Sequence, residues 1–156
     1  MTFGEEIAKW CEGSKEKTNI AVRKVGFEIL SRVVKKTPVD QGRARSNWFA
    51  TVNNPSSDTT EQSDKSGGAT INREIGNILR FDCFKDDALY ITNNLPYIRV
   101  LEYGGYPNPP LRGSWDKKSK SFVVKSSGGY SKQAPAGMVR VTLAEIDDIL
   151  NKAVKD

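Results

Sequence analysis

The first quarter of the chain has the apolar spacing of a long helix. Thr2 and Glu5 have the Thr-x-x-Glu form of a capping box, which predicts that the helix begins there. The apolar positions that recur at helical spacing are Phe3, Ile7, Trp10, Val22, Val25, Ile29 and Val33. Gly13 interrupts this pattern, which therefore fits one helix kinked near Gly13 or two helices joined there. The helix should end before Pro38, because the residue preceding a proline is disfavoured in the α region.

Alternation with a period of two predicts strands in the middle of the chain. Residues 47–53 place Trp48, Ala50 and Val52 on one face of a strand, and residues 88–92 alternate in the same way. A third strand is predicted over residues 121–125. Apolar residues at helical spacing predict two short helices between these strands, over residues 71–79 and 97–103.

A second strong helical pattern closes the chain. Its apolar stripe, with spacings of 4, 3 and 4 residues, consists of Val139, Leu143, Ile146 and Leu150. Ile149 and Ala153 flank that stripe, and lysines follow in the last turn, where the helix dipole favours cations. Pro135 suits the N-terminal boundary because its fixed φ is already helical. We expect the stripe to dock on the core.

This order of elements predicts an α+β fold. We expect one domain over residues 1–156, with a small, mainly antiparallel sheet packed by the long N-terminal helix and the C-terminal helix. Two long loops interrupt it. Residues 54–70 are polar and offer little to bury, so they are expected to be mobile, and residues 105–130 are the least regular part of the chain.

Composition places this chain of 156 residues among globular proteins, because 37% of its residues are hydrophobic and 28% are charged. Its apolar runs are too short for a transmembrane helix. The start of the chain is acidic and has no hydrophobic stretch of the kind found in signal peptides, so we expect synthesis in the cytoplasm and no membrane partner.

The residues that usually carry catalysis or bind metals are sparse. The chain has no histidine, and its two cysteines, Cys11 and Cys83, are far apart, so neither a zinc site nor a Ser-His or Cys-His triad can be assembled. Both cysteines read as small buried hydrophobes. No phosphate-binding loop, dinucleotide motif or nucleophile elbow occurs. We therefore expect no enzyme, no cofactor and no metal, with a metal-dependent nuclease as a distant alternative.

Net charge leaves two interpretations open. The formal charge is +5, and its densest basic cluster lies at residues 116–120, with Lys125 and Lys132 nearby. Such a cluster fits a solvated loop or a phosphate-binding patch, and the second interpretation gives the alternative function, a nucleic-acid-binding module. Arg43 and Arg45, in the turn ahead of the first strand, fit either solvated side chains or a basic edge that contacts an acidic partner.

Four short strings, taken together, resemble a known family. Residues 37–48 read Thr-Pro-Val-Asp-Gln-Gly-Arg-Ala-Arg-Ser-Asn-Trp, and residues 91–97 read Ile-Thr-Asn-Asn-Leu-Pro-Tyr. Residues 101–104 read Leu-Glu-Tyr-Gly, and residues 131–140 read Ser-Lys-Gln-Ala-Pro-Ala-Gly-Met-Val-Arg. In this order they resemble the signature of the tail-completion or neck proteins of long-tailed bacteriophages, a family that includes relatives of the lambda minor tail protein Z. About two dozen residues between Gly104 and Ser131 depart from the family, which often has only a few there.

The resemblance implies a structural role without catalysis. Such proteins act at the head-proximal end of the tail, which they complete or terminate so that a filled head can join. The expected partners are further copies of the chain in a ring, with a hexamer favoured, and the tail tube, tail terminator or head-tail connector proteins. DNA contact is possible in such a setting. The expected location is the host cytoplasm during assembly and then the virion.

The resemblance also directs attention to particular contact residues. We expect them in the basic turn, in the 131–140 string and in the inserted loop, namely Arg43, Arg45, Trp115, Lys132, Gln133, Pro135 and Arg140. Trp48 and Tyr97 are expected to pack in the core instead. Reversing the charge of both Arg43 and Arg45 should then leave the fold intact and abolish tail joining.

Overall fold

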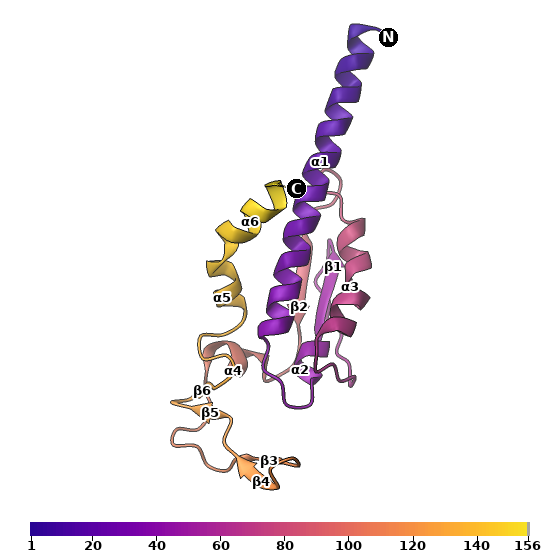
Figure 1. Ribbon diagram of the computed structural model, residues 1–156. Helices are drawn as coiled ribbons and strands as arrows, with labels where there is room; N and C mark the ends of the chain where they lie inside the picture. Colours follow the sequence, from indigo (N-terminus) through magenta and orange to yellow (C-terminus); the bar gives the residue numbers. More distant parts are fainter. Residues whose placement is uncertain (156) are drawn as a thin grey trace.

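The computed structural model describes residues 1–155 (Figure 1). Its longest element is the first helix. Helix α1 (Phe3–Lys36) runs without interruption through Gly13, so the two predicted possibilities resolve to a single helix. The predicted capping box is present: the Glu5 N–H donates to Thr2 Oγ1, and the Thr2 N–H donates to the Glu5 carboxylate. The helix ends at Thr37, whose N–H bonds to carbonyls of the last turn.

One two-stranded sheet lies against α1. Strand β1 (Trp48–Val52) pairs antiparallel with β2 (Leu89–Asn93), and Ala50 lies opposite Ile91. Helix α3 (Gly68–Arg80) packs against β1 and α1 (Figure 1). The predicted alternation is confirmed, since the side chains of Trp48 and Ala50 are buried. The largest fully buried apolar side chains of the core are Leu30, Val33, Val34, Ile78, Met138 and Ile149.

The segment before α3 has more to bury than its polar composition suggested. Asp64 is only 8% exposed, and its carboxylate accepts bonds from the backbone N–H groups of Gly67 and Thr70 and from the Thr70 hydroxyl. These are the free N–H groups at the start of α3, so Asp64 caps that helix. Burial raises the pKa of Asp64, but the bonds from Thr70, Gly67 and Ser66 outweigh it and lower the pKa to about 2.

The C-terminal pattern forms two helices rather than one. Helix α5 (Val139–Ala144) and helix α6 (Ile146–Lys155) are separated at Glu145. The predicted apolar stripe is also wrong, because Leu143 and Leu150 are exposed whereas Ile149 and Ala153, which were expected to flank it, are buried. The break at Glu145 changes the phase between the two helices, so one continuous 3.6-residue stripe cannot describe both.

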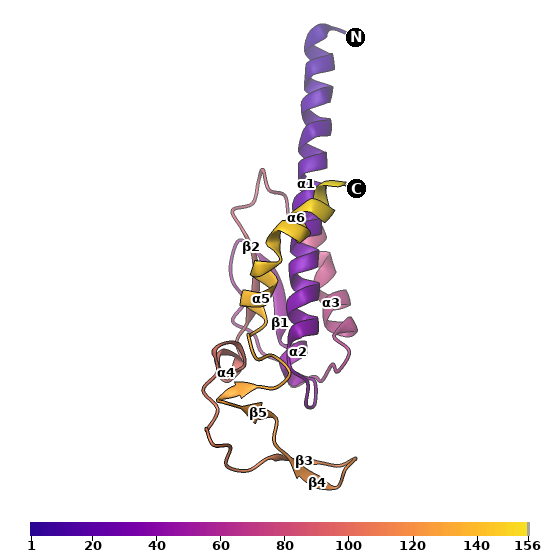
Figure 2. The ribbon, with the colours of Figure 1, turned by 60° about the vertical axis from the view of Figure 1, so that its left-hand side comes forward.

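Both C-terminal helices pack chiefly against α1, not on the sheet as expected (Figure 2). An ionic network joins them to it. The Arg32 guanidinium on α1 lies 2.6 Å from carboxylate oxygens of both Glu145 and Asp148, and Lys36 lies 2.7 Å from Glu145. The bonds with Asp148 and Glu145 raise the pKa of Arg32 still further above its usual value.

The remaining elements are short. Helix α2 (Arg43–Ser46) precedes β1, and α4 (Ile98–Tyr103) follows β2. Two small hairpins follow, one of β3 (Ser114–Asp116) with β4 (Ser121–Val123), the other of β5 (Ser126–Ser127) with β6 (Tyr130–Ser131). The predicted α+β class with antiparallel strands is therefore confirmed, and within residues 1–155 the strands form three separate two-stranded sheets where one small sheet was expected. Within the same residues, no helix has the length and apolar content to span a membrane.

Two parts of the chain stand away from this body. The N-terminal half of α1 extends beyond every other element at one end of the molecule, and the β3–β4 hairpin projects at the opposite end (Figures 1 and 2).

Candidate interaction site

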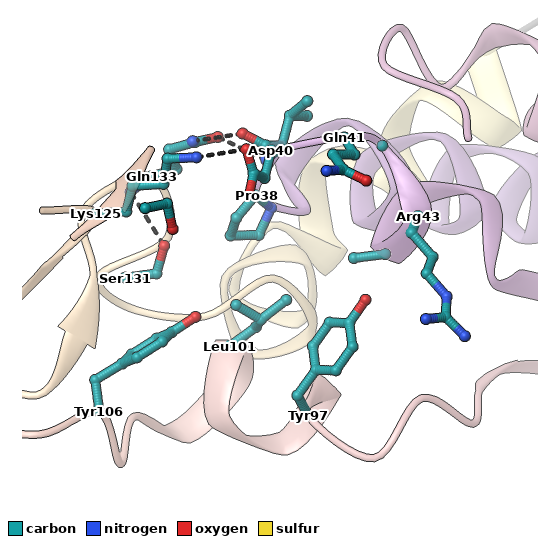
Figure 3. Close-up of a pocket in the computed structure, with 14 residues that line it drawn as sticks. Pro38, Asp40, Gln41, Arg43, Tyr97, Leu101, Tyr106, Lys125, Ser131 and Gln133 are labelled. Carbon is teal, nitrogen blue, oxygen red and sulfur yellow. Dashed lines mark hydrogen bonds and ion pairs between the residues drawn. The ribbon is translucent and has the colours of Figure 1, made fainter. Parts of the chain in front are cut away.

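Strings that are far apart in the sequence meet around one pocket at the foot of α1 (Figure 3). The pocket has a volume of about 300 Å³. One wall comes from the turn between α1 and α2, a second from α4 and the residues beside it, and a third from the segment after β6 (Figure 3). The pocket therefore collects residues from all four strings that carry the family resemblance, at residues 37–48, 91–97, 101–104 and 131–140.

The side chain of Gln133 joins two of these walls. Its Oε1 accepts from the Val39 N–H at 2.7 Å, and its Nε2 donates to the Val39 carbonyl oxygen at 2.9 Å. The amide thus bonds to the backbone of Val39 as a neighbouring strand would. Beside it, Lys125 Nζ lies 2.5 Å from Asp40 Oδ1 (Figure 3). The Val39 turn is consequently held at a fixed place above the pocket.

Two tyrosines and a leucine form the opposite side (Figure 3). Leu101 is buried, whereas Tyr97 is 41% exposed. Burial raises the pKa of Tyr106, and the neighbouring Tyr97 adds to that rise. The expectation that Tyr97 packs in the core is wrong, because its ring borders an open pocket; the same expectation for Trp48 is confirmed.

Arg43 is held at the pocket by a single side-chain ion pair. Its Nη2 lies 2.5 Å from Glu61 Oε1, in a pair whose side chains are 42% and 82% exposed. The Arg43 Nε is buried and has no hydrogen-bond partner among the described residues. An exposed pair of this kind contributes little to stability, so the guanidinium is free to exchange Glu61 for another carboxylate.

Arg45 has a different role. Its guanidinium donates to three carbonyl oxygens, those of Lys35, Thr37 and Lys65, at 2.6–2.9 Å. Lys35 and Thr37 end α1, where carbonyls lack helical partners, so Arg45 caps α1 and ties it to the loop before α3. Desolvation lowers the pKa of Arg45, and Asp64 opposes that change. These contacts contradict the expectation that the charge of Arg45 can be reversed while the fold stays intact.

Other residues of the 37–48 string also build the fold. Thr37 is fully buried, donates its hydroxyl to the Val33 carbonyl and accepts a bond from Trp48 Nε1 at 2.8 Å. Asn47, also fully buried, exchanges bonds with the backbone of Thr60. The rest of this string therefore serves local structure, whereas residues 38–44 line the pocket.

The 131–140 string is similarly divided. Arg140 donates its Nε to Glu102 Oε1 at 3.2 Å and an Nη to the Glu102 carbonyl, and it lies over the Tyr103 ring. The Glu102 carboxylate also accepts the backbone N–H groups of Met138, Val139 and Arg140 at the start of α5. Burial raises the pKa of Glu102, but these bonds outweigh it and lower the pKa overall. Arg140 thus has an intramolecular partner and belongs to the junction of α4 and α5.

The other predicted contact residues lie outside the pocket. Trp115 is on the β3–β4 hairpin and is 53% exposed, and Lys132 and Pro135 are exposed. Of the predicted set, only Arg43 and Gln133 meet at the pocket. Sequence reasoning missed Asp40, Tyr97, Leu101 and Tyr106 as pocket residues. Asp40, Tyr97 and Leu101 lie inside the strings that resemble the family, so the resemblance could have pointed to them. Tyr106 lies outside those strings, and nothing in the sequence pointed to it.

The charged side chains that line the pocket are those of Asp40, Arg43 and Lys125. Within residues 1–155, no three Asp, Glu or Cys side chains gather as a metal site would require. Cys11 and Cys83 are unpaired and half-buried, not the buried hydrophobes expected. The pocket instead offers an apolar floor, two phenols and a guanidinium at its edge, which suits a side chain or short segment of another protein.

Comparison with known proteins adds no relative: no family model, curated protein or solved structure matches the chain.

Proposed function

We propose that the chain is a structural protein of the head-proximal end of a long-tailed bacteriophage tail, where it completes the tail and allows a filled head to join. The observation that carries this proposal is the convergence of the resembling strings on one pocket. Strings that resembled the family by chance would have no reason to meet in space. The rest of their residues hold those pocket segments in place, as Arg45, Asn47 and Glu102 do.

In this function the pocket receives a segment of a neighbouring protein. Arg43 is the residue best suited to bind a carboxylate of that neighbour, because its present partner Glu61 is 82% exposed and readily displaced. The ring of identical subunits, with a hexamer favoured, and the tail tube, tail terminator or connector as neighbours, belong to the proposal through the family resemblance.

The proposal is tested by complementation. A phage or prophage that carries this gene is disrupted in it, and purified protein is added to the extract, where infectious particles are counted. Wild-type protein should restore joining to accumulated heads and tails, and Arg43→Glu should not. Arg80→Glu is the matched control, because Arg80 is exposed at the end of α3 and lines no part of the pocket. Normal joined particles from the disrupted phage would overturn the proposal.

A nucleic-acid-binding module is the second candidate, and one observation favours it. Exposed Trp115 and Phe122 lie on the hairpin whose tip carries Lys117, Lys118 and Lys120, and aromatic rings among lysines suit single-stranded nucleic acid. This function requires that DNA binding weaken steeply as salt rises and that Trp115→Ala weaken it further.

A further inference from the structure

Side chains of α3 close the outer edge of β1. The Glu74 carboxylate accepts the Ala50 N–H at 2.8 Å, and the Asn77 side chain donates to the Ala50 carbonyl oxygen at 2.9 Å. Arg73 donates to the Trp48 carbonyl oxygen at 2.8 Å. One helix thus supplies the bonds that a third strand would make, so no further strand can pair with β1 on this side (Figure 1).

The same bonds show which main-chain groups of β2 point outward. Ala50 lies opposite Ile91, and because Ala50 directs its N–H and carbonyl at α3, these two residues exchange no ladder bonds. Every second residue of a strand shares this orientation, so Leu89, Ile91 and Asn93 direct their N–H and carbonyl groups away from β1. No hydrogen bond from elsewhere in residues 1–155 reaches these main-chain groups. The outer edge of β2 is therefore open.

Nothing in the sequence of β2 protects this edge. Proteins usually guard an open edge with a charged side chain, a proline or a bulge, but β2 reads Leu-Tyr-Ile-Thr-Asn and pairs with β1 in a continuous register. Its core-facing side chains, Leu89 and Ile91, are only half-buried, whereas Trp48 and Ala50, on the same face of β1, are 4% and 0% exposed. The edge thus lacks both a main-chain partner and full side-chain cover.

Helix α1 prevents two copies of β2 from forming an antiparallel pair. It packs directly on β2, since a Cβ at Gly26 would stand 2.6 Å from Leu89 Cδ2. Antiparallel pairing would place the two strands about 4.8 Å apart, with both α1 helices on the same face of the joint sheet. Packed helices need about 8–10 Å between their axes, so the two α1 helices would collide. Parallel pairing is the less stable arrangement.

The other strands within residues 1–155 do not match the open edge either. β3 and β4 have three residues each, and β5 and β6 have two, against five in β2. The outer edge of β1 is already closed by α3. The strand that fits is therefore one from a different protein, extended along the whole of β2 and free of a helix on the face that meets α1.

We propose that β2 receives an extended arm of a different protein, which adds to the sheet as a third strand antiparallel to β2. Main-chain bonds to Leu89, Ile91 and Asn93 hold the arm, as in other cases of strand addition. The residue opposite Ile91 has its side chain on the same face as Ile91, toward α1, so the arm carries apolar side chains at every second position. No residue of β2 lines the pocket, so this contact is separate from the one in the proposed function and does not depend on it.

A synthetic peptide tests the edge in the full chain. The probe has valine alternating with threonine over about seven residues, with a lysine at each end for solubility. At saturation it should slow deuterium exchange of the Leu89 and Ile91 amides at least tenfold, because these N–H groups gain acceptors. Amides of α6 should keep their rates. Absence of slowing at Ile91 up to millimolar peptide would overturn the proposal.

Two methylated peptides show whether the main chain is what binds. In the antiparallel arrangement the valines face α1 and turn their N–H groups toward β2, whereas the threonines turn theirs toward solvent. N-methylation of the valines should abolish the slowing at Ile91. N-methylation of the threonines should leave it within about threefold of the unmodified peptide. Equal effects of the two methylated peptides would refute strand addition.

A substitution at Ile91 supplies the matched change in the protein. Ile91→Pro removes an N–H that points away from β1, which an edge strand tolerates, and should weaken peptide binding at least tenfold. Ile91→Val keeps the N–H and should bind within about twofold of wild type. Thermal unfolding shows whether the variants stay folded, and the methylated peptides decide the matter if Ile91→Pro does not. Sedimentation of the chain without peptide tests the source: self-association that Ile91→Pro abolishes would make the occupant a second copy and overturn the proposal.

Discussion

Gly137 lies against the carboxylate of Glu102 so closely that no side chain fits between them. A Cβ at Gly137 would stand 2.6 Å from Glu102 Oε1 and 2.7 Å from the Glu102 carbonyl oxygen. Gly137 also has a φ of +86°, which side chains with a Cβ rarely adopt. The carboxylate of Glu102 occupies this place in order to reach the first N–H groups of α5. One glycine therefore lets α4 cap α5.

Gly137→Ala should lower the free energy of unfolding by about 2 kcal/mol or more, from the left-handed φ and the displaced carboxylate together. Urea denaturation measures the loss. Gly76→Ala is the control, since Gly76 lies within α3 with no atom near its would-be Cβ, and alanine there should stabilise by about 0.5–1 kcal/mol. Equal stability of the two variants would contradict the close approach of Glu102 and Gly137.

Asp64 should make stability depend on pH in the acid range. Its pKa in the folded chain is about 2, against an ordinary 3.8, so folding favours the ionised form. The resulting stability is fully present above pH 4 and is lost as pH falls from about 4 to about 2; it amounts to at most about 2 kcal/mol at 1.36 kcal/mol per pKa unit. Asp64→Asn should lower the free energy of unfolding at pH 7, and the difference from wild type should shrink by pH 2.

Urea denaturation at a series of pH values measures this difference. Asp87→Asn serves as the matched control, because Asp87 is exposed and accepts no side-chain hydrogen bond in the described chain. A difference between wild type and Asp64→Asn that stays constant from pH 7 to pH 2 would refute the role of the Asp64 carboxylate.

The two arginines of the basic turn should separate stability from assembly. Arg45→Glu should lower the free energy of unfolding by about 2–3 kcal/mol, since three carbonyls lose their charged donor. Arg43→Glu should change it by no more than about 0.5 kcal/mol, since its pair with Glu61 is exposed. Thermal unfolding measures both. A folded, fully stable Arg45→Glu would show that the cap on α1 is dispensable.

Arg32 should hold the C-terminal helices on α1. Arg32→Met keeps the apolar stem but removes the bonds to Glu145 and Asp148, so amides of α6 should exchange with deuterium at least tenfold faster. Amides of α3 should keep their rates, because α3 packs on another side of α1. Arg80→Met, which loses only a bond to Asn77, should leave α6 unchanged. Unaltered exchange in α6 would mean that Ile149 and Ala153 suffice to hold it.

Local signals in the sequence predicted the elements whose partners are a few residues away. Thr2 and Glu5 predicted the start of α1, and Pro38 predicted its end. The alternation around Ala50 predicted the first strand. Each of these depends on backbone geometry over one or two turns. The α+β class followed from their order.

Features that depend on distant partners were out of reach. The sequence shows that residues 45 and 140 are arginines. Which carbonyl and carboxylate oxygens Arg45 and Arg140 bind depends on the fold, which brings distant residues next to them. Asp64 looked like part of a polar loop because its value as a cap depends on the left-handed turn at Gly67. The C-terminal stripe was wrong for the same reason: Arg32 and Lys36 bind Glu145 at the break between α5 and α6, and the two helices differ in phase.

The great length of α1 has a consequence for how the chain opens. Its C-terminal half is buried in the core, so those amides exchange only when the whole chain unfolds, whereas its first turns rest on the Thr2 cap and their own hydrogen bonds. Helical segments of that length are marginal in water on their own. Within this one uninterrupted helix, the free energy of local opening thus rises from nearly zero at Phe3, where the helix frays, to the free energy of global unfolding at Leu30.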